Sequence, residues 1–67
     1  MGWCSGTDIF DSIILSAENN GINFESKAGK RFFQDTVEAF WNHDWDCEGD
    51  SNYFYLIQEL FPEEFPE

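Results

Sequence analysis

The apolar residues of this 67-residue chain recur three and four positions apart, a spacing that places them on one face of an α-helix. The pattern occurs in three segments, which are separated by turn-forming residues. We expect helices at about residues 8–19, 27–43 and 52–61, followed by a short polar tail at 62–67. The alternation of apolar and polar residues that is typical of a strand does not occur. The sequence therefore predicts an all-α fold, a single small three-helix domain over residues 1–67.

Capping and stop residues indicate where these helices begin and end. Thr7 is expected to cap the first helix and Ser26 the second, because their hydroxyls can accept hydrogen bonds from free backbone N–H groups. Asp50 or Ser51 is expected to cap the third helix. Gly21 tolerates the left-handed conformation in which many helices end.

Aromatic side chains are expected to supply much of the core. A chain of this length is close to the lower limit for a self-supporting domain, but 19% of its residues are aromatic. Burying one large apolar side chain stabilises a fold by roughly 1.5–3 kcal/mol. The expected core-facing residues are Ile9, Phe10, Ile13, Ile14, Ala17, Ala28, Phe32, Phe33, Val37, Phe40, Trp41, Tyr53, Leu56, Ile57, Leu60 and Phe61. Phe65 is expected to fold back onto them.

Charge limits the partners that the protein can have. The chain has 14 Asp and Glu residues but only 3 Lys and Arg, so its formal net charge is −11. All the cations lie within residues 27–31, and residues 32–67 contain neither Lys nor Arg. A field of this sign repels phosphate groups, which excludes direct binding to nucleic acid and to an anionic membrane. We expect a protein partner with a basic surface.

The acids expected to bind this partner lie on the second and third helices, on the loop between them and on the tail. They are Asp35, Glu38, Asp44, Asp46, Glu48, Asp50, Glu59, Glu63 and Glu64. Carboxylates held in a fixed array imitate the phosphates of a nucleic acid and can block the basic groove that normally binds it. Acidity of this kind also serves plain solubility.

The sequence contains no complete catalytic constellation. A Cys and the single His could pair, but no residue is evident that would orient the His, and no Gly-rich oxyanion turn is present. We therefore expect an interaction protein, not an enzyme, and no cofactor.

A metal-binding domain is an alternative interpretation. Residues 44–55 resemble the calcium loop of an EF-hand, but Tyr55 stands where that loop needs a bidentate Glu. For zinc, Cys4, His43 and Cys47 would supply three ligands. Because both sets are incomplete, we expect no specific metal site. The candidate ligands are Cys4, His43, Cys47, Asp44, Asp46, Glu48 and Asp50.

The cysteines and the surplus aromatic residues allow two further expectations. In the absence of a secretion signal, Cys4 and Cys47 are expected to be free thiols that lie near each other in the fold. A third function is that of a self-associating structural protein, with Trp3, Trp45 and Tyr55 at its interface. No apolar run approaches the roughly 18 residues that suggest a membrane-spanning helix, so we expect a soluble protein that stays in the compartment where it is made.

Three motifs resemble a family of small uncharacterised proteins encoded by tailed bacteriophages and prophages. They are the start MGWCSGT at residues 1–7, the HDWDC motif at residues 43–47 and DSNYF at residues 50–54. The resemblance implies a phage product acting in the cytoplasm of a bacterial host, and it implies no particular activity. A host nucleic-acid-binding or defence protein is then the expected target. This chain departs from the family in its Phe-rich second helix and in a tail that ends in Pro66-Glu67.

Overall fold

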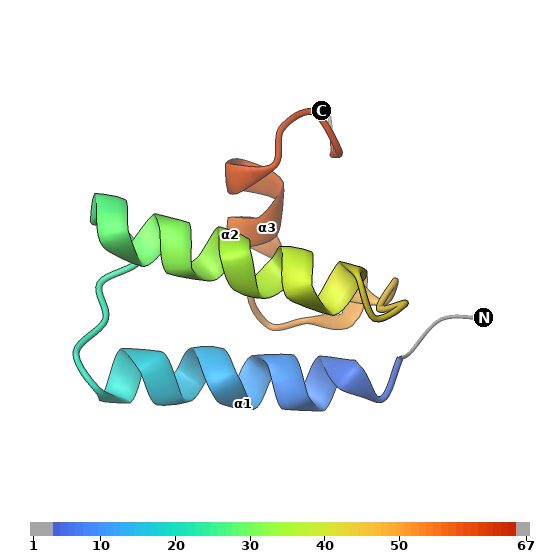
Figure 1. Cartoon of the computed structure of the whole chain (residues 1–67), viewed down its shortest axis with the longest axis horizontal. Coiled ribbons are helices and arrows are strands. Elements are labelled where there is room, and N and C mark those ends of the chain that lie inside the picture. The colour runs from blue at the N-terminus through green and yellow to red at the C-terminus, as the bar shows by residue number, and fades with distance from the viewer. Residues whose placement is uncertain (1–3, 66–67) are drawn as a thin grey trace.

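The computed structural model describes residues 4–65 and confirms the small all-α three-helix fold (Figure 1). Helix α1 spans Gly6–Asn19, α2 spans Lys27–Trp41 and α3 spans Phe54–Leu60. A short 3-10 helix, η1, spans Glu48–Asp50 within the connection from α2 to α3. No strand occurs in the part of the chain that the structure describes.

Helices α1 and α2 lie side by side and run in opposite directions, and the short α3 packs against α2 at a steep angle (Figure 1). The side-chain amide of Gln34 on α2 donates a hydrogen bond to the carbonyl oxygen of Leu60, at 3.1 Å, and so ties the end of α3 to α2. The chain then folds back as expected, because Phe65 packs against the core. The remaining residues of the expected tail, Pro66 and Glu67, lie outside the described residues.

The helix ends confirm some of the expected caps and correct others. Ser26 caps α2, since its Oγ accepts a hydrogen bond from the backbone N–H of Gly29 at 3.0 Å. Thr7 does not cap α1, because the helix already begins at Gly6. The hydroxyl of Thr7 donates to the carbonyl oxygen of Cys47 instead. Ser51 accepts a hydrogen bond from the N–H of Tyr53 at 3.0 Å, but α3 starts after this turn, two residues later than expected.

Two left-handed residues reverse the chain after α1 and α2. Gly21 has a φ of +89°, as the stop predicted at this position requires. Asp44 has a φ of +68°, a conformation that few residues other than Gly, Asn and Asp adopt readily. Beyond Asp44, the N–H of Trp45 donates to the carbonyl of Phe40 at 3.1 Å. This turn ends α2 at Trp41 and directs the chain back toward α1.

The core is mainly aromatic and lies between the three helices and the connections. Its buried residues are Phe10, Ile14, Ala17, Phe24, Phe33, Val37, Trp45 and Ile57. Phe10 is at its centre: its ring stacks on Trp45 at a centroid distance of 4.7 Å and makes edge contacts with Phe33 at 5.6 Å and Phe40 at 5.4 Å. Such aromatic pairs contribute about 0.5–1.5 kcal/mol beyond the area they bury.

Gly29 is required by a close approach of two backbone segments. A Cβ at this position would lie 1.8 Å from the carbonyl oxygen of Asn23. The first turn of α2 therefore packs directly on the connection from α1, where Phe24 enters the core. Helix propensity alone would have favoured Ala here.

Candidate functional site

The acidic loop that connects α2 to α3 passes beside the first turn of α1, and a hydrogen bond from Trp45 holds it in this position. The indole ring of Trp45 is only 2% exposed, and its Nε1–H donates to Thr7 Oγ1 at 3.0 Å. The hydroxyl of Thr7 in turn donates to the carbonyl oxygen of Cys47 at 3.2 Å. One buried hydroxyl thus joins two points of the loop to α1.

Asp11 forms a second anchor one turn further along α1. Its carboxylate accepts hydrogen bonds from Ser51 Oγ at 2.5 Å and from the backbone N–H of Asn52 at 3.1 Å. Asp11 therefore acts as a capping group for the turn before α3, although it lies 40 residues away from Ser51 in the sequence.

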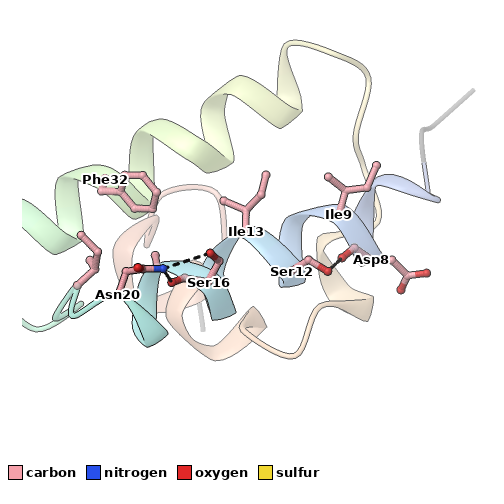
Figure 2. Close-up of a pocket in the computed structure, with 9 residues that line it drawn as sticks. Asp8, Ile9, Ser12, Ile13, Ser16, Asn20 and Phe32 are labelled. Atoms are coloured by element: carbon pink, nitrogen blue, oxygen red, sulfur yellow. Dashed lines mark hydrogen bonds between the residues drawn. The ribbon is translucent and has the colours of Figure 1, made fainter.

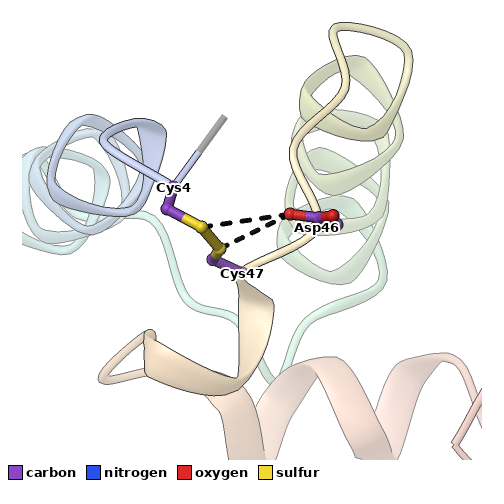
Figure 3. A group of neighbouring side chains, drawn as sticks. All are labelled: Cys4, Asp46 and Cys47. Carbon is purple, nitrogen blue, oxygen red and sulfur yellow. Dashed lines mark hydrogen bonds between the residues drawn. A yellow bond between two sulfur atoms is a disulfide. The ribbon is translucent and has the colours of Figure 1, made fainter. Parts of the chain in front are cut away.

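A disulfide between Cys4 and Cys47 forms the third anchor (Figure 3). The expectation of free thiols is therefore wrong, whereas the expectation that the two residues are neighbours is confirmed, with a Cα–Cα distance of 5.1 Å. The anchors at Thr7 and Trp45 explain this proximity, because they place the loop against the start of α1. The expectation of free thiols rested only on the missing secretion signal, and a signal of that kind carries no information about contacts within the fold.

The acids expected to bind a partner are accessible in the structure. Asp35, Glu38, Asp44, Asp46, Asp50, Glu59, Glu63 and Glu64 are exposed, and Glu48 is half-buried. The loop acids Asp44, Asp46, Glu48 and Asp50 have no Lys or Arg near them in the sequence. We call these four residues the loop acids.

The acids of α2 have a different setting. Asp35 and Glu38 line a shallow groove together with the only cations of the chain, Lys27, Lys30 and Arg31. Opposite charges so close together weaken each other's field. The loop acids are therefore the stronger part of the expected acidic face.

The metal candidates do not assemble as the sequence patterns suggested. Among the described residues, one group of three possible ligands converges: Cys4, Asp46 and Cys47, whose ligand atoms all lie within 4.8 Å of one another. His43 is not part of this group, and the other loop acids do not join Asp46 in an EF-hand arrangement. Part of the segment that resembles a calcium loop, residues 44–55, forms the short helix η1 instead.

Tyr53 carries the one clearly perturbed ionisation among the described residues. Burial raises its pKa, and the hydrogen bond from its hydroxyl to Glu18 Oε1 at 2.9 Å and the negative charge of Glu18 raise it further, to about 12. Tyr53 is thus held as a neutral donor that ties the start of α3 to α1 and takes no part in acid–base chemistry near neutral pH.

A second surface, without cations, is an apolar groove between α1 and α2 with a volume of about 630 Å³ (Figure 2). Ile9, Ile13 and Phe32 project into it and are 48%, 36% and 38% exposed, so their expected burial in the core is incorrect. These three side chains lie at the edge of the α1–α2 pair. Phe10, the residue that follows Ile9, is buried in the core instead. Among the described residues that line the groove, Asp8 is the only charged one.

Comparisons with protein-family models, with curated proteins and with solved structures find no match. In the part of the chain that the structure describes, no helix is long and apolar enough to span a membrane.

Proposed function

We propose that this protein is an interaction protein whose loop acids bind the basic surface of a protein that normally holds nucleic acid. The supporting observation is that the loop is anchored to α1 by Thr7 with Trp45 and by Asp11, contacts that do not need the disulfide, and that the disulfide adds a third link in the oxidised form. A loop held in this way presents its carboxylates without the cost of ordering them on binding. Exposed charges on a freely moving loop would lose much of that advantage.

The proposed target is a nucleic-acid-binding or defence protein in the cytoplasm of a bacterial host. Charge supports the nature of the target, since a molecule of net charge −11 associates fastest with a positive surface. The resemblance to phage proteins supports the setting, in which blocking such a protein would favour infection. The loop acids and the exposed Glu59, Glu63 and Glu64 would then occupy positions that phosphates take in the natural complex.

The experiment compares two variants that lose the same charge. Asp44→Asn with Asp50→Asn removes two loop acids, and Asn tolerates the left-handed conformation of residue 44. Asp8→Asn with Glu25→Gln removes two exposed acids outside the proposed face. Both raise the net charge by the same amount, so only the position of the charge differs.

A partner is first captured from bacterial lysate at low salt and released by raised salt. The purified partner is then titrated with nucleic acid in competition with each form of the protein. The loop variant should compete roughly 2- to 30-fold less well than the wild type, as expected for two exposed ion pairs, and the control should match the wild type. Equal competition by both variants, or a captured partner that binds no nucleic acid, would contradict the proposal.

A second candidate function is self-association through the apolar groove. Two copies of a chain with net charge −11 repel each other least where carboxylates are scarce, and within residues 4–65 Asp8 is the only acid that lines this groove. A second copy of the chain is therefore the proposed occupant. The interface first expected needs correction, since Trp45 is buried, Trp3 lies outside the described residues, and only Tyr55, 64% exposed, remains from that set.

Sedimentation equilibrium tests the second candidate with two matched variants. Ile9→Asp places a charge in the groove, whereas Leu15→Asp places one at a similarly exposed position outside the lining; these side chains are 48% and 52% exposed. We expect a concentration-dependent dimer that Ile9→Asp abolishes and Leu15→Asp retains. A wild-type monomer at all concentrations, or equal effects of the two variants, refutes this candidate.

A further inference from the structure

We propose that Cys4, Asp46 and Cys47 form a redox-gated site for a thiophilic divalent metal ion such as Zn²⁺, which the disulfide closes and reduction opens. The proposal does not rest on the acidic-face function, although Asp46 belongs to both sites. It starts from the orientation of Asp46, whose carboxylate points at both sulfur atoms (Figure 3). Its Oδ1 lies 3.4 Å from Cys47 Sγ and 4.0 Å from Cys4 Sγ.

A carboxylate gains little from facing a disulfide, which has no proton to donate. The same position is favourable once the bond is reduced, because both thiols can then donate S–H hydrogen bonds to Oδ1. It is also favourable around a metal ion. Tetrahedral zinc with Zn–S of roughly 2.3 Å and Zn–O of roughly 2.1 Å separates S and O ligands by roughly 3.6 Å. The S···O distances of the disulfide form bracket this value, and they are kept if the two sulfur atoms move apart at a constant distance from Oδ1.

Only the two sulfur atoms have to move for the site to form. In the same tetrahedral geometry they lie roughly 3.8 Å apart, so breaking the S–S bond and a small side-chain rotation suffice. The backbone anchors at Thr7 and Asp11 do not depend on the disulfide and keep the loop beside α1. Cys4 and Asp46 are exposed, so solvent supplies the fourth ligand.

The chemistry of opening balances with an ordinary dithiol reductant. One thiolate of the reductant attacks a sulfur of the Cys4–Cys47 bond, and the second then releases the protein, so the reductant leaves as its own disulfide and the two cysteines become thiols. Zinc then displaces the two thiol protons and is bound by two thiolates and the Asp46 carboxylate. Cys4 is exposed, which gives a small reductant access to the bond.

The surroundings favour the metal-bound state in a reducing compartment. Thiol reductants keep most cysteine pairs reduced in the cytoplasm. The protein carries a net charge of −11 and three further acids in the same loop, Asp44, Glu48 and Asp50, and these attract a divalent cation. In this setting zinc takes over the cross-link between the start of α1 and the loop that the disulfide provides in the oxidised form.

The test titrates oxidised and phosphine-reduced protein with Zn²⁺ against a chromogenic chelator, and with Co²⁺ to detect thiolate-to-metal charge-transfer absorption. We expect one ion per reduced chain, release of about two protons and no chelator-resistant binding by the oxidised form. Asp46→Asn should weaken zinc binding by roughly 10- to 100-fold or more. Losses of that size follow when a residue that only supports a metal ligand is changed, and Asp46 is proposed to be a ligand itself. Asp44→Asn, which removes the same charge two residues away, should weaken zinc binding far less, because it removes only a distant charge and no ligand.

Folding is followed by circular dichroism in the same samples. If the reduced protein loses helix without metal, zinc should restore it, because the binding energy then contributes to folding. The proposal is overturned if zinc does not bind the reduced protein, or if zinc does not restore helix that reduction has removed. It is also overturned by equal binding by the oxidised form, or by equal losses for Asp46→Asn and Asp44→Asn, either of which would assign the binding to the acidic loop as a whole.

Discussion

The buried hydroxyl of Thr7 is the smallest group on which the position of the acidic loop depends. Thr7→Val keeps the shape of the side chain and removes only the donor and acceptor. Trp45 Nε1–H, on a residue that is 2% exposed, then has no acceptor, and the carbonyl of Cys47 loses its donor. Leaving a buried polar group unsatisfied costs about 1–3 kcal/mol, so we expect a loss of about 2–3 kcal/mol in the free energy of unfolding. For a domain of this size, the melting temperature should fall by roughly 10–20 °C.

The assay is urea denaturation of the oxidised protein, followed by circular dichroism. Thr7→Ser, which keeps the hydroxyl, is the matched control and should cost less than about 1 kcal/mol for the lost methyl group. A double-mutant cycle with Trp45→Phe isolates the hydrogen bond: Thr7→Val should cost at least about 1 kcal/mol less when the indole N–H is already absent. Equal losses for the Val and Ser variants, together with an additive cycle, would refute the role assigned to this hydroxyl.

Three other predictions concern the helix ends and the one perturbed tyrosine. Gly21→Ala should destabilise the fold by about 1–2 kcal/mol in urea denaturation, because an L-residue is strained at a φ of +89° even though the space around it is open. Gly29→Ala should cost more than Gly21→Ala, since its Cβ would meet the backbone oxygen of Asn23; equal costs would contradict the close packing. Absorbance titration of a variant whose only tyrosine is Tyr53 should give a midpoint near 12, and Glu18→Gln should lower it toward the ordinary 10.0. Because the folded-state pKa is raised, this tyrosine stabilises the fold below about pH 10 and the contribution is lost as the pH rises toward 12, so a stability profile that is flat over this window would contradict the assignment.

The helices were predictable because their signals are local. Apolar spacing placed α1 and α2 to within two residues, and the signal at Gly21 identified the end of α1. The end of α2 was harder to predict, because its left-handed turn falls on Asp44 and not on Gly, the residue that usually signals such a stop. The later start of α3 follows from the hydrogen bonds that Asp11 makes to the preceding turn, a contact that sequence spacing does not reveal.

The candidate site was less predictable because long-range contacts assemble it. Thr7 has the sequence context of a helix cap, and nothing near it in the chain indicates the buried indole that it binds. Trp45 lies among acids, and the sequence did not decide between burial and an exposed position at an interface; in the structure it fills the space beside Phe10. The cysteine pair differs, because its proximity was expected and is confirmed, whereas the expectation of free thiols rested on the compartment and is wrong.

The disulfide between Cys4 and Cys47 makes α1 and α2 part of one covalently closed ring, and α3 and the tail lie outside this ring. A protease that cuts once between the two helices, for example after Glu25, therefore opens the ring without releasing a fragment. The nicked molecule keeps its mass except for one added water, and it separates into two peptides only when a reductant is present.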